Sequence, residues 1–243
     1  MKLLSKRKFL LTLTAAAIII AAPKAGAQDK GDDNYSVSAL ALYGWNSNWK
    51  SYGGLDLRGH IPVNKYFEAN VGVVYNTPSI FSLTATARPK FKLPVGELYL
   101  DGTLHCRVLA NYRSAEWVMA GSVGYHKDYF GAQLGVFNRT VADMDRDAHS
   151  ANEYLSEPFN IMYKVYFKVR PECSKWNVGG GMTNFNEWQY ERHWQPFFFI
   201  DGHYDFNDNI RLLADVTIEP TGTFHLNANF YGIVTRVGVR YKF

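Results

Sequence analysis

The chain has 243 residues, a formal net charge of +4 and 16% aromatic residues, which suits one large all-β domain or two smaller domains. Its first 27 residues hold five basic residues and no acid, so without them the charge falls from +4 to −1. This balance argues against a nucleic-acid-binding domain, whose basic charge should remain without the leader, and we expect no nucleic acid among the partners.

Residues 1–27 have the pattern of a secretory signal peptide. Basic residues from Lys2 to Lys8 begin it, an apolar run follows over residues 9–22, and "AGA" at residues 25–27 provides a small-residue cleavage site. The apolar run is too short to cross a bilayer as a helix. We therefore expect cleavage after Ala27, a short segment over residues 28–34, and one domain over residues 35–243.

From residue 35 onward, most segments alternate between apolar and polar residues, which is the period of a β-strand. In "FEANVGVVY", for example, Phe67, Val71 and Tyr75 fall on one face and Glu68 and Asn70 on the other. About twelve such segments occur, each near the ~9 to 11 residues that a tilted strand needs to cross a membrane. They are expected to begin near Tyr35, Tyr52, Tyr66, Phe81, Glu97, Glu116, Tyr129, Asn160, Lys175, Gln195, Asn209 and Phe230.

The connections between these segments alternate in kind. One set is tight and rich in turn-forming residues: "PVNK", "KLPVG", "HKDY", "RPECSK" and "FNDN". The other set is longer or more polar: "WNSNWK", "NTPSI", "ANYRSAE", "TVADMDRDAHSANEYLSEP", "NFNEWQYERHW" and "EPTGTFHLNAN". This alternation predicts a single transmembrane, antiparallel, up-and-down β-barrel of about twelve strands, with short periplasmic turns and longer extracellular loops. An even strand number places both termini, and hence residues 28–34, in the periplasm.

Aromatic residues on the apolar faces gather near the ends of the segments, while the middles are mostly small or aliphatic. This placement indicates two aromatic girdles of a lipid-facing surface rather than the ordinary enrichment of aromatics in strands. The girdle residues are Tyr43, Trp45, Phe67, Tyr75, Trp117, Tyr125, Phe159, Trp176, Tyr204 and Tyr241.

The opposite faces are charged and are expected to line the barrel interior, the lumen. A basic ladder runs along one segment, and Arg88 and Lys90 are expected to face Glu97 and Asp101 across the "KLPVG" turn. Because buried charges must be hydrated or paired, we expect the lumen to be either filled with water or lined by many ion pairs. The sequence is consistent with an open lumen and with a plugged one. The predicted lumen-facing residues are Asp56, Arg58, Arg88, Asp101, His105, Arg107, Lys164, Lys168, Arg170, Asp201, His203, Asp215, Glu219, Arg236 and Arg240.

The last segment, "TRVGVRYKF", alternates to its end and stops at a phenylalanine. It resembles the carboxy-terminal signature of bacterial outer-membrane β-barrel proteins. The resemblance implies that the barrel-assembly machinery reads Tyr241 and Phe243, and that the last strand pairs with the first to close the ring. It also implies an outer-membrane location in a Gram-negative bacterium. The leader cut before Gln28 and the short Asn-rich and Gly-rich hairpins are similar to those of Bacteroides-type barrels.

No catalytic, metal-binding or cofactor-binding set is expected. The chain lacks an outward Ser and His pair of the kind a lipid hydrolase needs, although His105 or His203 with Asp101 or Asp201 leaves a lumen-side hydrolase open. Two cysteines and scattered histidines lack the spacing of a metal site, and a disulfide between Cys106 and Cys173 stays open. The acids of "DMDRD" are not followed by the glycine and terminal glutamate that a calcium-binding loop requires. The "GGG" run indicates a place where a strand bends or packs closely, rather than a nucleotide-binding loop.

Three functions remain open. A channel for small polar or charged solutes would use the charged walls as an electrostatic filter. A structural or accessory barrel subunit would keep those charges paired and act through partners. A lipid-modifying hydrolase is the third reading. The long connection over residues 141–158 is either extracellular or folded into the lumen, and the expected partners are outer-membrane lipid, the assembly machinery and small polar solutes.

Overall fold

The computed structural model describes residues 35–46, 50–77, 80–109, 114–143, 155–169, 175–185, 196–221 and 229–243. The expected signal peptide over residues 1–27 and the segment over residues 28–34 lie outside the described residues. So do Arg170, Cys173 and most of the connection over residues 141–158. Within the described ranges, no helix is long and apolar enough to span a membrane.

Twelve β-strands make up the described chain, in agreement with the alternation of the sequence. Their bounds are β1 (Ser36–Asn46), β2 (Lys50–Asn64), β3 (Phe67–Asn76), β4 (Ile80–Leu93), β5 (Gly96–Leu109), β6 (Ser114–Lys127), β7 (Phe130–Asp143), β8 (Leu155–Val169), β9 (Trp176–Thr183), β10 (Phe197–Asp205), β11 (Ile210–Thr221) and β12 (Asn229–Lys242). Eleven strands begin close to the expected residue. Strand β8 begins at Leu155, five residues before the expected Asn160.

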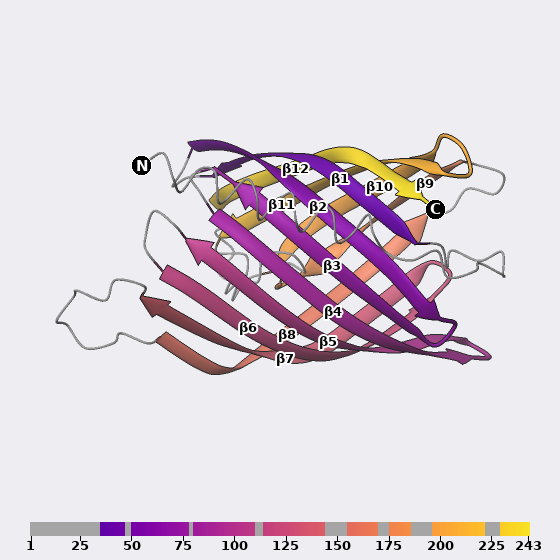
Figure 1. The fold of residues 1–243 in the computed structure, drawn as a ribbon, viewed down its shortest axis with the longest axis horizontal. Helices are drawn as coiled ribbons and strands as arrows, with labels where there is room; N and C mark the ends of the chain where they lie inside the picture. Colours follow the sequence, from indigo (N-terminus) through magenta and orange to yellow (C-terminus); the bar gives the residue numbers. More distant parts are fainter. Residues whose placement is uncertain are drawn as a thin grey trace.

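The strands form one closed antiparallel barrel in which each strand pairs with its neighbours in the sequence (Figure 1). The ring closes between β1 and β12, where Ser36 lies opposite Lys242 and Asn46 opposite Gly232. Beyond the last pair, the Phe243 amide donates a hydrogen bond of 2.9 Å to the Tyr35 carbonyl oxygen. Closure leaves no open sheet edge at this seam, as a barrel in a membrane requires. The expected up-and-down barrel is therefore confirmed.

One rim of the barrel holds the tight turns and the last residue, on the right in Figure 1. Three of its turns have only two residues between strands, at positions 65–66, 94–95 and 128–129. Asparagine and glycine shape them: Asn64 Oδ1 accepts a hydrogen bond of 2.8 Å from the Tyr66 amide, and Gly96 has φ +151°.

The opposite rim is only partly the long-loop rim that the sequence predicts. Its connections over residues 144–154, 184–196 and 222–228 are long, but those over residues 47–49, 77–79 and 110–113 have only three or four residues. At "WNSNWK", part of the more polar set, β1 and β2 continue to pair as far as Asn46 and Lys50, so the strands include the ends of this segment.

The alternation of side chains gives the wall two different faces. On β5, Leu104 exposes 62% of its surface outward, whereas the adjacent Thr103 and His105 expose 5% and 3%. Every residue of the predicted girdles lies on the outer face. The aromatic residues exposed there include Tyr43, Trp45, Tyr75, Trp117 and Phe159 toward the long-loop rim and Tyr66, Tyr129, Trp176, Tyr241 and Phe243 toward the tight-turn rim. The outer surface thus carries an apolar band between two aromatic belts, as lipid-facing barrels do.

Candidate functional site: the inner face of the barrel

The candidate site is the inner face, where the strand register brings together charged residues that are far apart in the sequence. Thirteen of the fifteen predicted residues have described side chains, and each lies on a strand position that faces the lumen. Of the other two, Arg170 lies outside the described residues, and only the backbone of Glu219 is described, opposite Gly232 in β12. Their use in solute passage stays a prediction.

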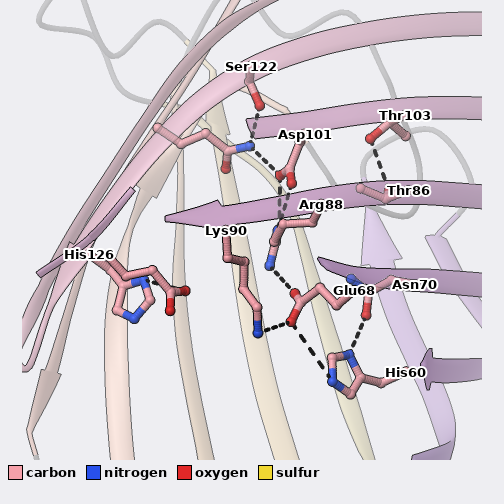
Figure 2. A network of polar contacts seen from close by, with 12 residues as sticks. His60, Glu68, Asn70, Thr86, Arg88, Lys90, Asp101, Thr103, Ser122 and His126 are labelled. Atoms are coloured by element: carbon pink, nitrogen blue, oxygen red, sulfur yellow. Dashed lines mark hydrogen bonds and ion pairs between the residues drawn. The ribbon is translucent and has the colours of Figure 1, made fainter. Parts of the chain in front are cut away.

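An ion-paired network crosses β3, β4 and β5 (Figure 2). The Arg88 guanidinium donates to both carboxylate oxygens of Asp101, at 2.6 and 2.9 Å, and to Glu68 Oε1 at 3.2 Å. Lys90 Nζ lies 2.9 Å from Glu68 Oε2, and the Tyr99 ring lies under the guanidinium at 4.6 Å. Charge-assisted, two-pronged contacts of this kind are the strong form of ion pair. The network therefore ties three strands together.

Polar side chains extend this network to β6 and β7. Gln133 Nε2 donates to Asp101 Oδ2 at 3.0 Å and to Ser122 Oγ at 2.7 Å. On β4 and β5, the hydroxyls of Thr86 and Thr103 lie 2.9 Å apart. Figure 2 shows this pair beside the network. Because these amide, hydroxyl and carboxylate groups bond to one another across strands, this part of the wall is held together rather than merely lined by charge.

Arg88 binds Asp101 across the β4–β5 turn as expected, and Lys90 binds an acid on the other neighbouring strand. The β4–β5 register places Lys90 opposite Tyr99 and gives Glu97 to Lys92. Lys90 instead reaches back to Glu68 on β3. The sequence offered acids on both neighbouring strands, and only the register decides between them.

A second group centres on Glu116 of β6, whose side chain is fully buried. Arg107 Nη2 donates to Glu116 Oε2 at 2.5 Å, and Arg139 Nε donates to Glu116 Oε1 at 2.9 Å. The Glu116 carboxylate thus binds two guanidinium groups, those of Arg107 and Arg139, from the strands on either side of β6. Removing a partner from such a buried group is costly because the remaining charges lose their solvation without compensation.

A third group joins β2 to β12 and β11 across the first strand. Asp56, also fully buried, accepts bonds of 2.9 and 2.6 Å from Arg58 and lies 3.4 Å from Arg236. Arg236 donates to Asp215 at 2.7 Å, and Arg240 donates to Ser38 Oγ at 3.1 Å. The ring closure between β1 and β12 is therefore bridged by ion pairs on the inside as well as by the backbone ladder. We call the inner face of β11, β12 and β1–β7 the ion-paired wall.

The lumen histidines His105 and His203 contact a hydroxyl and a carboxylate of nearby residues. His105 Nδ1 lies 2.7 Å from the Thr84 hydroxyl, while Asp101 is taken by Arg88 and Gln133. His203 Nε2 lies 3.9 Å from Asp205, a residue that Arg211 already binds at 2.6 Å. Among the described residues, no group of three or more His, Cys, Asp or Glu side chains is arranged to hold a metal ion, and Cys106 is free.

The inner face of β8, β9 and β10 differs, and we call it the β8–β10 wall. Lys164 and Lys168 lie near the aromatic rings of Tyr166 and Phe199, and the middle strand is the "GGG" run. Gly181 faces the lumen between Tyr166 and Phe199 in the strand register. This wall combines cations, rings and a stretch of bare backbone.

At the end of β9 the chain turns into the lumen, a feature that the sequence analysis missed. The Asn184 side chain takes over the pairing with β8, since Nδ2 donates to the Ile161 carbonyl at 2.8 Å and Oδ1 accepts from the Tyr163 amide at 2.8 Å. The Thr183 hydroxyl bonds to both the carbonyl and the amide of Phe185. These contacts stop β9 after eight residues and direct Phe185 inward.

Phe185 packs against an apolar cluster on the inner faces of β6, β7 and β8, formed by Val118, Phe137 and Met162. All four side chains are buried, with 4% exposure or less. A second apolar cluster of Leu42, Val74, Val234 and the partly buried Tyr52 lies on β1, β2, β3 and β12. In the order of the ring these strands are opposite β6–β9, so two apolar patches flank the lumen toward the long-loop rim. A phenylalanine placed after the expected strand gave no sequence signal for this role.

The comparisons with known proteins concern the fold. No protein-family model and no curated protein sequence matches the chain. A KdgM porin in complex with disordered oligogalacturonate has a TM-score of 0.53 at 11% identity, over 86% of this chain and 99% of that chain. A NanC porin has a TM-score of 0.53 at 10% identity, over 85% and 100% of the two chains.

The translocator domain of the autotransporter NalP from Neisseria meningitidis has a TM-score of 0.51 at 12% identity, over 98% of both chains. These three similarities cover nearly the whole of each barrel. At such low identity they show the fold alone. The fold is that of porin-like outer-membrane β-barrels.

Proposed function

We propose that this protein is an integral outer-membrane channel for small polar or charged solutes. The observation that carries the proposal is the contrast between the two faces of a closed barrel, apolar and aromatic outside but charged on the strands that line the lumen. A polar inner face is what an aqueous pathway through a membrane barrel requires. The lysines of the β8–β10 wall favour anions among the possible solutes. One of the similar porins was solved with oligogalacturonate, so acidic solutes are suitable first probes.

The experiment that tests the channel is single-channel recording of the purified, refolded protein in a planar bilayer. Folding is checked first by heat-dependent migration in gels, since a closed barrel resists unfolding by detergent until it is heated. Stepwise currents are the expected result. A fully folded and inserted barrel that carries no current would contradict the channel and would favour the second candidate.

That second candidate is a structural or accessory barrel, and the ion-paired wall favours it. Asp56 and Glu116 are fully buried and bound by arginines, so much of the inner charge contributes to holding strands together. An accessory barrel would co-purify with a larger membrane complex. We propose no catalytic role, in keeping with the porin structures to which this barrel is similar. A Bacteroides-type origin is likewise a proposal that rests on the sequence resemblance alone.

We further propose that the end of β12 is the assembly signal. Tyr241 and Phe243 stand on the outer face with ring centroids 5.0 Å apart, in an edge-on arrangement. We expect Phe243→Ser to lower the yield of folded barrel while leaving export across the inner membrane unchanged. Phe206→Ser is the matched control, because Phe206 is an exposed aromatic in a turn of the same rim but lies outside the last strand. An equal loss of yield in both variants would contradict the signal.

A further inference from the structure

An apolar belt interrupts the charged lining of the lumen. It consists of the two apolar clusters, without Tyr52, and of one further phenylalanine on β10, so its members are Leu42, Val74, Val118, Phe137, Met162, Phe185, Phe197 and Val234. Phe197 is buried on the inner face, since the adjacent Phe198 is exposed on the outer face. It lies opposite Thr183, whose hydroxyl bonds to Phe185, so it continues the first cluster around the ring.

Hydroxyl and imidazole side chains continue the belt between the two clusters. Each lies opposite or diagonal to a belt residue in the strand register, and each is buried: Ser82, Thr84, His105 and Thr217. Charged residues stand two positions away on either side of the belt. Glu116 precedes Val118 toward the long-loop rim, and Arg236 follows Val234 toward the tight-turn rim. The belt therefore separates two charged levels of the lumen.

The belt is shielded from water. All eight of its apolar side chains expose 5% of their surface or less. By contrast, Lys92 and Lys168, two inner-face lysines nearer the tight-turn rim, are exposed. Side chains that line a water-filled lumen keep contact with water, as these lysines do. Water therefore reaches the lumen near the tight-turn rim but is excluded at the belt.

An apolar stretch of a pore controls passage through its affinity for water. Apolar side chains offer water no hydrogen bonds, so a narrow stretch lined by them empties readily. An ion that enters a dry stretch must leave its hydration water behind, which costs much free energy. Hydroxyl groups at the same positions would hold water there and lower this cost. The polarity of the belt thus controls passage separately from its width.

We propose that the apolar belt is a hydrophobic gate, which passes solutes only while it is wetted and favours weakly hydrated anions over strongly hydrated ones. The proposal rests on the channel function and names the property of the solute that the channel selects. Thiocyanate is a suitable weakly hydrated probe, and fluoride is the strongly hydrated counterpart. Both carry one negative charge, so their comparison isolates the cost of losing hydration water.

The test is single-channel recording of the refolded full-length chain beside the double variant Val118→Thr/Val234→Thr. Valine and threonine have nearly the same volume, so this variant changes the polarity of the belt and keeps its width. Because two buried hydroxyls without partners disfavour the dry state, we expect the fraction of time spent open to rise about tenfold. An unchanged open fraction in a variant that migrates as a folded barrel would overturn the gate.

Val123→Thr/Val237→Thr is the matched control. These two valines lie on the same strands as the belt valines, β6 and β12, but they are exposed on the outer face. We expect this variant to have the open fraction of the unchanged chain. A rise equal to that of the belt variant would show a general effect of threonine on the wall and would overturn the gate.

A second readout uses the unchanged chain and so does not depend on the folding of a variant. Its conductance in potassium thiocyanate, relative to that in potassium fluoride, should exceed the ratio of the two salts in bulk solution. A ratio equal to that of bulk solution would overturn the selection by hydration. In the belt variant, we expect the excess to disappear.

The outcomes separate the gate from the channel. An unchanged chain that conducts with the same open fraction as the folded belt variant would keep the channel and overturn the gate. A silent unchanged chain whose belt variant conducts would keep the belt as the barrier and overturn the native channel. Silence of both folded barrels would overturn both proposals.

Discussion

The ion-paired wall and the β8–β10 wall use charge in different ways. In the ion-paired wall, arginines bind acids on the same strand, on the next strand or across one strand at 2.5 to 3.4 Å, and several of these side chains are buried. In the β8–β10 wall, lysines lie on aromatic rings beside a strand of glycines, and Lys168 is exposed. Arginine suits the first role because its planar fork binds carboxylates in two places, and lysine suits the second because its ammonium is mobile and readily solvated.

This difference indicates that charged residues inside a barrel of this size have two distinct roles. Paired charges join neighbouring strands and exclude void space, so changing them should alter stability. Lysines held by rings remain able to contact a solute, so changing them should alter selectivity with little effect on stability. The predictions below separate the two walls by these readouts.

The largest effect is expected in the ion-paired wall. Glu116→Gln leaves Arg107 and Arg139 without their shared carboxylate, and we expect the free energy of unfolding to fall by about 3 to 5 kcal/mol. Urea unfolding of the refolded barrel, followed by tryptophan fluorescence, measures this change.

Lys168→Gln provides the comparison for that prediction. Because Lys168 is exposed, its replacement should change the free energy of unfolding by about 0.5 kcal/mol or less. If Lys168→Gln destabilised the barrel as much as Glu116→Gln does, the division into two walls would fail.

A somewhat smaller effect is expected where the end of β9 enters the lumen. Phe185→Ala leaves a cavity in the cluster formed with Val118, Phe137 and Met162. We therefore expect the free energy of unfolding to fall by about 3 kcal/mol. Because Phe185 occupies part of the lumen, single-channel conductance should rise in the same variant. An unchanged conductance with the expected destabilisation would mean that Phe185 supports the wall without narrowing the pathway.

The glycines of the β8–β10 wall give the smallest of these stability effects. Gly181→Ala places a Cβ against the Val165 carbonyl and the Tyr166 backbone, which cannot move aside easily, so we expect a loss of about 1 to 3 kcal/mol. Gly121→Ala on β6 is the control, since a Cβ there would meet nothing within 4 Å. Comparable stability of the two variants would show that the bare backbone of β9 is not required.

The sequence predicts the architecture well because a barrel wall is governed by local rules. A period of two separates Leu104 from His105, and turn residues such as Asn64 and Gly96 mark the reversals. These signals lie within a few residues of each other, so twelve strands and two faces follow without knowledge of the pairing.

The partners of individual charges depend on register and on side-chain reach, which the sequence leaves undetermined. Lys90 had acids on both neighbouring strands, and the structure shows it bound to Glu68 on β3. The inward turn at Asn184 depends on a side-chain amide that replaces a backbone ladder, and Phe185 follows it in a connection with no periodic pattern. Such features arise from tertiary contacts between strands and are visible only in the folded barrel.

The measurement that tests the account most directly is the ratio of anion to cation permeability, taken from reversal potentials across a potassium chloride gradient. The account predicts anion preference in the unchanged channel, a shift toward cations in Lys164→Gln/Lys168→Gln, and little shift in Lys92→Gln. Equal shifts in the double variant and in Lys92→Gln, or none in either, would contradict the claim that the β8–β10 wall selects the solute.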